Sequence, residues 1–128
     1  DHPEYKAAIT LLSYRHVYRL RELPESVRAS IDHENHAIYL AMQGPNEFHF
    51  TGNLTGWNRL PDLPRISTPA LVLVGRHDEL TPACAMRMHR ALPDSEIVVF
   101  PNSSHMAMYE EPDAYLAAVR DFLGRHRG

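Results

Sequence analysis

The hydrophobic pattern divides the chain into two regions. Residues 69–126 contain two short apolar runs, at 70–75 and 96–100, which proline and glycine residues bound. Runs of this length predict strands that are buried on both faces, as in a parallel sheet with helices on either side. Residues 1–60 contain no comparable run and are rich in aromatic and polar residues. We therefore expect a region without clear strands to be followed by a region built on two strands.

Helical signals separate and follow the two predicted strands. Thr81 and Pro82 are typical of an N-cap followed by proline at the first helical position, and this helix should extend to about Leu92. Another helix should begin at Pro112 and carry an apolar stripe that reaches Leu123. The order strand, helix, strand, helix predicts a right-handed parallel crossover unit. Because two such strands need neighbours, we expect the chain to be a piece of a larger sheet or to pair with another polypeptide.

The first region is predicted to be mostly helical. Apolar residues at three- and four-residue spacings favour a helix over residues 4–21, and Pro24 can begin a second helix. Residues 36–42 are expected to form a third short helix, and residues 47–53 an ordered loop that follows a Gly-Pro-Asn turn. Three prolines within residues 60–69 indicate a connector between the two regions.

Composition narrows the class of protein. The chain has 128 residues, of which 44% are hydrophobic and 23% charged, with a net charge of -3. This balance is that of an ordinary globular domain and excludes a polybasic nucleic-acid binder. The longest apolar run is too short to span a bilayer, and the first residues show no signal-peptide pattern. The single cysteine, Cys84, excludes an internal disulfide framework, which suits a reducing compartment, and we expect a cytoplasmic protein.

Two loops that follow the predicted strands carry the residues of greatest chemical interest. Asp78 comes after the first strand and His105 after the second. Functional groups gather beyond the carboxyl ends of parallel strands, and neighbouring strands lie about 5 Å apart. We therefore expect the Asp78 carboxylate to meet the His105 imidazole. A carboxylate in this position fixes the tautomer of the ring and stabilises the imidazolium that forms when histidine takes a proton, which is half of a nucleophilic triad.

These segments resemble a known family. The two loops resemble the acid and histidine loops of the α/β-hydrolase fold, in which the triad runs nucleophile, acid, histidine along the chain. The Met-Gln-Gly-Pro-Asn-Glu-Phe segment at 42–48, together with Trp57, narrows the resemblance to the proline iminopeptidase family, which includes tricorn-interacting aminopeptidases and amino-acid amide hydrolases. The resemblance covers nearly the whole chain. It implies an α/β fold, with residues 1–60 as part of a helical cap and 61–128 as the C-terminal part of the hydrolase core.

The resemblance also implies a role for each matching residue. Asp78 would be the triad acid and His105 the general base. Glu47 and Glu79 match the glutamates that bind the free α-amino group of the substrate, for which carboxylates are the natural acceptors. No metal or organic cofactor is implied. Candidate walls of an apolar pocket for the first residue of the substrate are Phe48, Phe50, Trp57, Met108 and Tyr109.

The nucleophile of the triad is not found in this chain. None of its serines stands in a Gly-x-Ser-x-Gly pattern, and the glycine-rich oxyanion segment is missing as well. We therefore expect the C-terminal part of a serine aminopeptidase that prefers proline, with the N-terminal part as a second chain or a missing segment. One alternative is an amino-acid amide or ester hydrolase of the same fold. An alternative of another class is a non-catalytic fragment that completes the sheet of a partner.

Other chemically suggestive residues favour a structural interpretation. His33 and His36 are spaced for one helical face, but without further ligands they do not predict a metal site. Cys84 is expected to be a packing residue because no base is paired with it in the sequence. Ser103 and Ser104 are expected to orient the histidine rather than to serve as the nucleophile.

Overall fold

The computed structural model describes residues 2–126. The chain forms two compact units, one made of the residues up to Leu20 and from Leu60 onward, the other of Arg21–Arg59. The sequence pattern places a single boundary near residue 60, whereas in the structure the N-terminal helix groups with the strands. The physical reason is that the segment after this helix is hydrogen-bonded to the loops beyond the strands.

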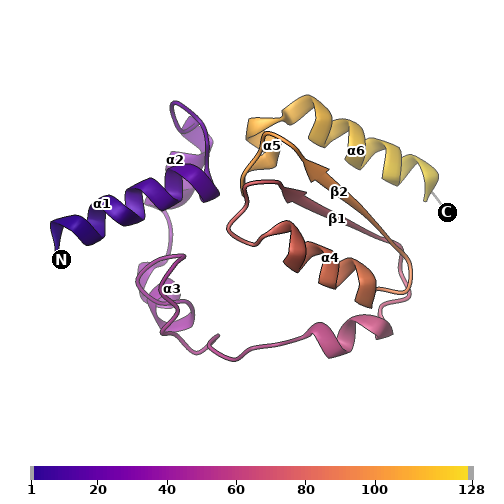
Figure 1. Cartoon of the computed structure of the whole chain (residues 1–128), viewed down its shortest axis with the longest axis horizontal. Coiled ribbons are helices and arrows are strands. Elements are labelled where there is room, and N and C mark those ends of the chain that lie inside the picture. The colour runs from indigo at the N-terminus through magenta and orange to yellow at the C-terminus, as the bar shows by residue number, and fades with distance from the viewer. Residues whose placement is uncertain (1, 127–128) are drawn as a thin grey trace. The chain divides into compact units, whose positions relative to one another are not determined.

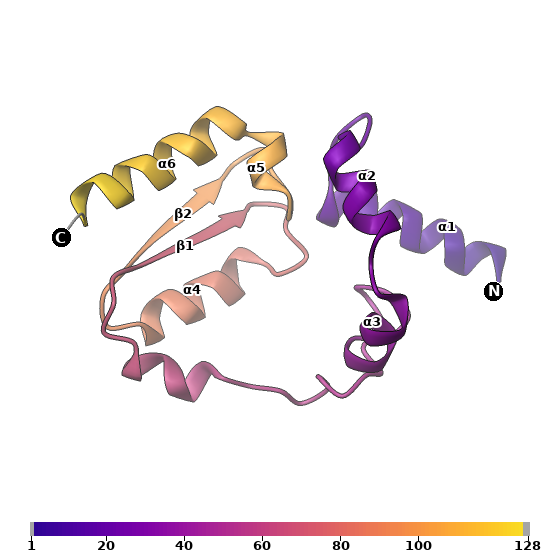
Figure 2. The same cartoon turned by 180° about the vertical axis from the view of Figure 1, so that it is seen from behind.

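The strand-containing unit has the predicted topology. Strand β1 (Ala70–Gly75) pairs in parallel with β2 (Ser95–Phe100), and α4 (Pro82–Ala91) connects them. Helix α6 (Pro112–Arg125) follows β2 and lies on the opposite side of the sheet from α4 (Figures 1 and 2). A short helix that was not predicted, α5 (Ala107–Glu110), comes before α6. The observed unit is the expected layering of helix, parallel sheet and helix.

Burial of the two strands is less complete than the apolar runs predict. Only the ends of the strands are buried, at Val74, Gly75 and Phe100, while Val99 is 42% exposed. Phe100 is anchored by the ring of Tyr115 in α6, at a centroid distance of 5.8 Å. The prediction that both strands are buried on both faces is therefore wrong for the structure of this chain by itself. Among the residues described, the sheet has only two strands, so each strand lacks a neighbour on one edge.

The N-terminal helix stops earlier than predicted. Helix α1 (Pro3–Leu12) continues as a π-helical turn, η1 (Ser13–Val17), and ends there rather than at residue 21. The backbone becomes extended at Tyr18, where φ is -147° and ψ is 124°. The Tyr18 N–H still donates to the carbonyl of Ser13 at 3.0 Å, which closes the wider turn. The chain therefore leaves this helix as an extended segment.

The second unit contains the two predicted short helices. Helix α2 (Glu25–Asp32) follows Pro24, and α3 (His36–Met42) is capped by Asn35, whose Oδ1 accepts the Ile38 N–H at 3.2 Å. The expected turn and loop come next. Gly44 has φ 131°, and a Cβ there would lie 2.4 Å from the carbonyl oxygen of His49. Glycine is therefore required at this turn by both backbone angle and space.

Two local predictions need correction. The proline-rich connector is not simply extended, because Leu60–Arg65 form a short 3-10 helix (η2). Thr81 precedes α4 as expected, but its side chain does not cap the helix by hydrogen bonding to the backbone. Its hydroxyl instead donates to Sγ of Cys84 at 3.6 Å. Pro82 at the first helical position therefore sets the start of α4 without help from a side-chain cap.

Candidate active site

The two loops beyond the strands run together past the end of the sheet. We call residues 76–81 the acid loop and residues 101–105 the histidine loop. The Arg76 N–H donates to the Phe100 carbonyl at 2.8 Å, and the His77 N–H donates to the Ser103 carbonyl at 2.9 Å. A Cβ on Gly75 would lie 2.1 Å from the Ser104 carbonyl oxygen. The absence of a side chain at Gly75 therefore allows the loops to touch.

Asp78 is fixed within the acid loop by local hydrogen bonds. Its N–H donates to the Gly75 carbonyl at 3.2 Å, and its Oδ1 accepts the Leu80 N–H at 2.9 Å. This is the turn that an aspartate forms with the backbone two residues ahead. The residue is 8% exposed. Asp78 is thus buried, and hydrogen bonds to nearby backbone groups set its orientation.

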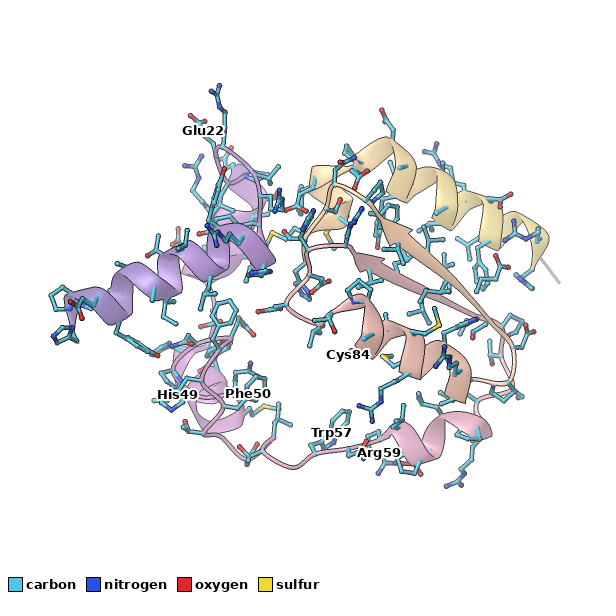
Figure 3. The ribbon with its side chains drawn as sticks, in the orientation of Figure 1. Glu22, His49, Phe50, Trp57, Arg59 and Cys84 are labelled. Atoms are coloured by element: carbon cyan, nitrogen blue, oxygen red, sulfur yellow. The ribbon has the colours of Figure 1, made fainter. Side chains whose placement is uncertain are left out.

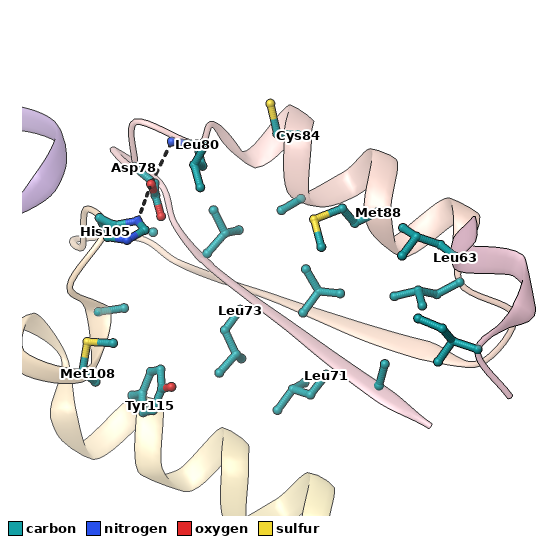
Figure 4. A pocket seen from close by; sticks show the side chains of 18 residues that line it. Leu63, Leu71, Leu73, Asp78, Leu80, Cys84, Met88, His105, Met108 and Tyr115 are labelled. Atoms are coloured by element: carbon teal, nitrogen blue, oxygen red, sulfur yellow. Dashed lines mark hydrogen bonds and ion pairs between the residues drawn. The ribbon is translucent and has the colours of Figure 1, made fainter. Parts of the chain in front are cut away.

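The structure brings Asp78 and His105 into the predicted contact. Nδ1 of His105 lies 3.1 Å from Oδ1 of Asp78 (Figure 4). With the Nδ1 proton donated to the carboxylate, Nε2 of the neutral ring carries the lone pair. The histidine side chain is 44% exposed, in contrast to the buried carboxylate. A ring held at one nitrogen by an acid and open to solvent on part of its surface has the geometry of a general base.

A segment distant in the sequence joins the two loops. The carbonyl of His16 accepts the backbone N–H groups of Glu79 and of His105, both at 3.2 Å. Nδ1 of His16 lies 2.8 Å from the carbonyl oxygen of His77. The end of the N-terminal helix therefore holds the acid and histidine loops together. Sequence reasoning missed this residue because a backbone carbonyl acceptor leaves no signal in residue type.

Two consecutive glutamates, Glu110 and Glu111, also hold the histidine loop by hydrogen bonds. Glu111 accepts the Asn102 N–H at 3.0 Å and the Ser103 hydroxyl at 2.5 Å. The Ser103 hydroxyl, with help from Asn102, lowers the pKa of the Glu111 carboxyl from its ordinary value. Glu110 accepts the Ser104 hydroxyl at 2.6 Å. Both serines are completely buried, so each hydroxyl is paired with a carboxylate as a buried polar group requires.

A cavity of about 590 Å³ lies beside the Asp78 and His105 pair. It extends along β1 between the helices on the two sides of the sheet, and apolar residues such as Leu73, Met88 and Tyr115 line most of it (Figure 4). Four side chains in its described lining can gain or lose a proton. They are the Asp78 carboxylate, the His105 imidazole, the Cys84 thiol and the Tyr115 hydroxyl. The cavity is therefore an apolar trough with a polar pair in its wall.

The predicted substrate-binding residues of this unit lie around the two loops. Met108 lines the cavity together with His105, and Figure 4 shows both. Tyr109 is the next residue, 39% exposed, and is not part of the described cavity lining. Glu79 follows Asp78 in the acid loop, is half-buried and has its Oε2 atom shielded from solvent. Glu79 therefore lies in the acid loop beside Asp78, whereas Met108 lies in α5, shortly after the histidine loop.

The remaining predicted residues belong to the second unit. The Glu47 carboxylate is half-buried and accepts hydrogen bonds from the Tyr39 hydroxyl at 2.6 Å and from Nε2 of Gln43 at 3.0 Å. Phe48 is half-buried, whereas Trp57 is 67% exposed. Phe50, labelled with Trp57 in Figure 3, is also exposed. Within this unit, Glu47 is thus held in one orientation by two donors on or beside α3.

A metal site, a reactive thiol and a membrane-spanning helix would each depend on particular features of the described residues. Residues 2–126 contain no group of three or more histidine, cysteine, aspartate or glutamate side chains arranged to hold a metal ion. Cys84 is an exposed free thiol. No helix in the same range combines the length and the apolar character needed to cross a membrane.

Relatives of known name match almost the whole chain. A proline iminopeptidase of Saccharolobus solfataricus is 38% identical over 122 residues, covering 94% of this chain and 39% of the relative. The crystal structure of the proline iminopeptidase of Mycobacterium smegmatis superposes with a TM-score of 0.91 at 36% identity, over 98% of this chain and 42% of the other. The crystal structure of VinJ gives a TM-score of 0.90 at 37% identity, with 98% and 43% coverage.

Coverage and family membership follow from these matches. The chain spans about two-fifths of the length of the relatives it matches. The family model described as "Alpha/beta hydrolase family" matches residues 3–118, which include the acid loop, the histidine loop and both strands. The parallel strands with flanking helices agree with that fold. On these grounds, the chain belongs to the alpha/beta hydrolase family.

Proposed function

We propose that this chain supplies the acid and the general base of a serine aminopeptidase that prefers an N-terminal proline. The observation that carries the proposal is the 3.1 Å contact between Asp78 and His105, just beyond the carboxyl ends of two adjacent parallel strands. Relatives named proline iminopeptidase support the choice of reaction, because they match the chain over nearly its whole length.

The proposed chemistry is acyl transfer through a serine outside this chain. His105 accepts the serine proton through Nε2 as the serine oxygen bonds to the carbonyl carbon of the scissile peptide. Asp78 stabilises the imidazolium that results. His105 then gives this proton to the amine nitrogen as the C–N bond breaks, which leaves an acyl-enzyme. His105 next takes a proton from a water molecule as the water oxygen bonds to the acyl carbon, and it returns this proton to the serine oxygen as the bond between serine and acyl group breaks. Backbone N–H groups, also outside this chain, would hold the oxyanion.

We assign substrate recognition to carboxylates and apolar side chains. A peptide with a free amino terminus presents an ammonium group near the scissile carbonyl, and Glu47 and Glu79 are the proposed acceptors. The two hydrogen bonds that Glu47 accepts from Tyr39 and Gln43 support this role, because they leave a charged carboxylate in a fixed direction. The proposed apolar contacts to the proline ring come from Phe48, Trp57, Met108 and Tyr109.

The proposed partner of this chain is the N-terminal part of the same enzyme, either as a second chain or as a preceding segment. Two observations support it. Among the described residues, β1 pairs with β2 alone, which leaves the other edge of β1 open. The apolar cavity extends along β1 between the flanking helices, where a further strand of the same sheet would be covered on both faces.

Replacing Asp78 tests this function directly. In the full-length product of the gene, Asp78→Asn should reduce kcat on a chromogenic proline anilide by roughly 10³- to 10⁴-fold, because the amide no longer stabilises the imidazolium. Circular dichroism should show an unchanged fold. Asp113→Asn is the matched control, since Asp113 is an exposed carboxylate in the first turn of α6. A near-normal rate for Asp78→Asn contradicts the assignment.

A panel of substrates separates the proposed reaction from its alternatives. The wild-type protein should hydrolyse the proline anilide faster than an amino-acid amide or an N-blocked proline anilide. Preference for the amide would replace the aminopeptidase with an amide hydrolase. Absence of all hydrolysis in a protein that carries the complete sheet would favour the non-catalytic alternative.

A further inference from the structure

We propose that Glu110 is the positioning residue for His105, an inference that rests on the proposed function. One carboxylate gathers three donors from two segments. Its Oε1 accepts the Ser104 hydroxyl and the Arg19 N–H, and its Oε2 accepts the Ser104 N–H. Glu110 touches neither Asp78 nor the ring of His105 in any of these contacts. Its influence on the general base would therefore pass through the backbone of the histidine loop.

The first step of the argument concerns the residue before the histidine. Ser104 is completely buried, and both its N–H and its hydroxyl donate to the same carboxylate. Two bonds to one rigid acceptor group restrain the backbone torsions of Ser104. The N–H of the next residue, His105, donates to the His16 carbonyl at 3.2 Å. The backbone N–H groups of Ser104 and His105 are thus held by Glu110 and by the His16 carbonyl, respectively. Because the backbone at His105 is fixed, the direction in which its imidazole leaves the backbone is restricted as well.

The second step concerns the charge of the group. Three donors converge on Glu110, and a carboxylate offers acceptor sites only. A glutamine would offer one oxygen and turn an NH₂ group toward a buried N–H or hydroxyl. Bonds to an ionised acceptor are also shorter and stronger than those between neutral groups. The site therefore requires a carboxylate, and an amide of the same shape should release the loop.

The third step concerns what else Glu110 holds. Arg19 lies in the extended segment after η1, next to the start of the second unit at Arg21. Its N–H shares an acceptor oxygen with the Ser104 hydroxyl. The carboxylate therefore links the histidine loop to the same N-terminal segment whose His16 carbonyl contacts both loops. Release of Glu110 should loosen both holds on the histidine loop.

The test is Glu110→Gln in the full-length product of the gene. Misplacement of a general base by a fraction of an ångström should lower kcat by about 10- to 100-fold and leave KM within about twofold, since no substrate contact is removed. Glu110→Asp should recover part of the rate. The matched control is Glu96→Gln, which removes a glutamate bonded to Arg125 on the surface, at 43% side-chain exposure. This control should keep the wild-type kcat.

A second readout does not depend on activity. Nuclear magnetic resonance of the ring nitrogens reports whether Nδ1 of His105 still donates its proton to Asp78. Glu110→Gln should broaden or remove that low-field proton signal, and Glu96→Gln should leave it in place. The wild-type protein could show the signal but no peptidase activity, while Glu110→Gln lacks the signal. In that case the proposed function fails and the positioning role stands.

The inference is overturned by one clear result. A folded Glu110→Gln protein with wild-type kcat and an unchanged His105 signal excludes a positioning role. If Glu110→Gln does not fold, Ser104→Ala takes its place, because it removes only one of the three donors to the carboxylate. Wild-type kcat and an unchanged His105 signal in Ser104→Ala overturn the inference in the same way.

Discussion

Glu47 shows how neighbouring side chains fix a single carboxylate in one orientation. Burial removes part of the hydration of this carboxylate, and the hydrogen bonds from the Tyr39 hydroxyl and the Gln43 amide compensate part of that loss. Gly75 illustrates the opposite case, where the absence of a side chain is what matters. Even a methyl group there would collide with the histidine loop, so the contact of Asp78 and His105 depends on it.

Replacement of Glu47 should lower kcat/KM more for substrates with a free amino terminus than for substrates without one. Glu47→Gln removes the charge that we propose to bind the α-ammonium group, so kcat/KM for a free proline anilide should fall by about 10- to 100-fold. This corresponds to the loss of one charge-assisted bond in a partly buried site. A simple ester without an amino group should lose less than about threefold. Steady-state kinetics on both substrates measures the difference.

The control for this experiment comes from the same unit. Glu34→Gln removes another carboxylate beside α3, whose Oε1 lies 3.7 Å from Nδ1 of His36. Glu34→Gln should leave kcat/KM unchanged for both the proline anilide and the ester. Equal losses on the anilide and the ester in Glu47→Gln would show that Glu47 supports the fold of its unit and has no part in recognition.

At the scale of elements, the conformations of the acid loop and the histidine loop are set by neighbouring helices as well as by the strands. The histidine loop lies between β2 and the short helix α5, and the two glutamates at the junction of α5 and α6 bond back to it. The acid loop lies between β1 and α4 and is joined to the histidine loop by the His16 carbonyl. Both loops therefore depend on helices that flank the sheet or precede it.

Acidification should weaken this arrangement at Glu111. The Ser103 hydroxyl and the Asn102 N–H lower the pKa of Glu111 in the folded protein from its ordinary value of 4.5. The unfolded chain therefore takes up the proton first as pH falls. The contribution of Glu111 to stability is full above about pH 4.5 and is lost as pH falls through the lowered pKa of the folded state.

Denaturant unfolding from pH 7 to pH 3 measures this effect. The difference in the free energy of unfolding between wild type and Glu111→Gln should shrink as pH falls through this range. Glu4→Gln, which replaces a carboxylate with 92% side-chain exposure, should show no such pH-dependent difference. A wild-type advantage over Glu111→Gln that is constant at all pH values would show that ionisation of Glu111 contributes nothing to the fold.

At the scale of the whole molecule, the chain consists of two units, and the described residues of one unit contain a two-stranded sheet. Within residues 2–126, β1 pairs only with β2, and a largely apolar cavity of about 590 Å³ lies beside β1. A strand edge with exposed N–H and carbonyl groups is a template for pairing with another strand. The relatives are more than twice as long as the part that this chain matches, which supports the proposed N-terminal partner.

Complementation tests the proposed partner. The chain expressed alone should show no hydrolysis of a proline anilide, and addition of the separately expressed N-terminal part should restore it and allow the two to be co-purified. An N-terminal part whose Gly-x-Ser-x-Gly serine is changed to alanine should still bind but should restore no activity. Hydrolysis by this chain alone would place the nucleophile within it and contradict the proposal.

The sequence by itself determined both strands, most of the helices and one long-range contact. Proline, glycine and apolar runs predicted both strands, α2, α3, α4 and α6, because such signals act within a few residues. The contact of Asp78 with His105 was predictable as well, since the ends of adjacent parallel strands meet at one edge of a sheet.

Only the tertiary structure decided how the loops are held. The His16 side chain meets the His77 carbonyl across 61 positions of the sequence, and Glu110 meets the Arg19 N–H across 91. No periodicity or motif in the sequence predicts either contact. Backbone groups are the same in nearly every residue, so any segment of suitable shape can supply them. Their partners are chosen by packing of the whole unit, and so they emerge only when the chain is folded.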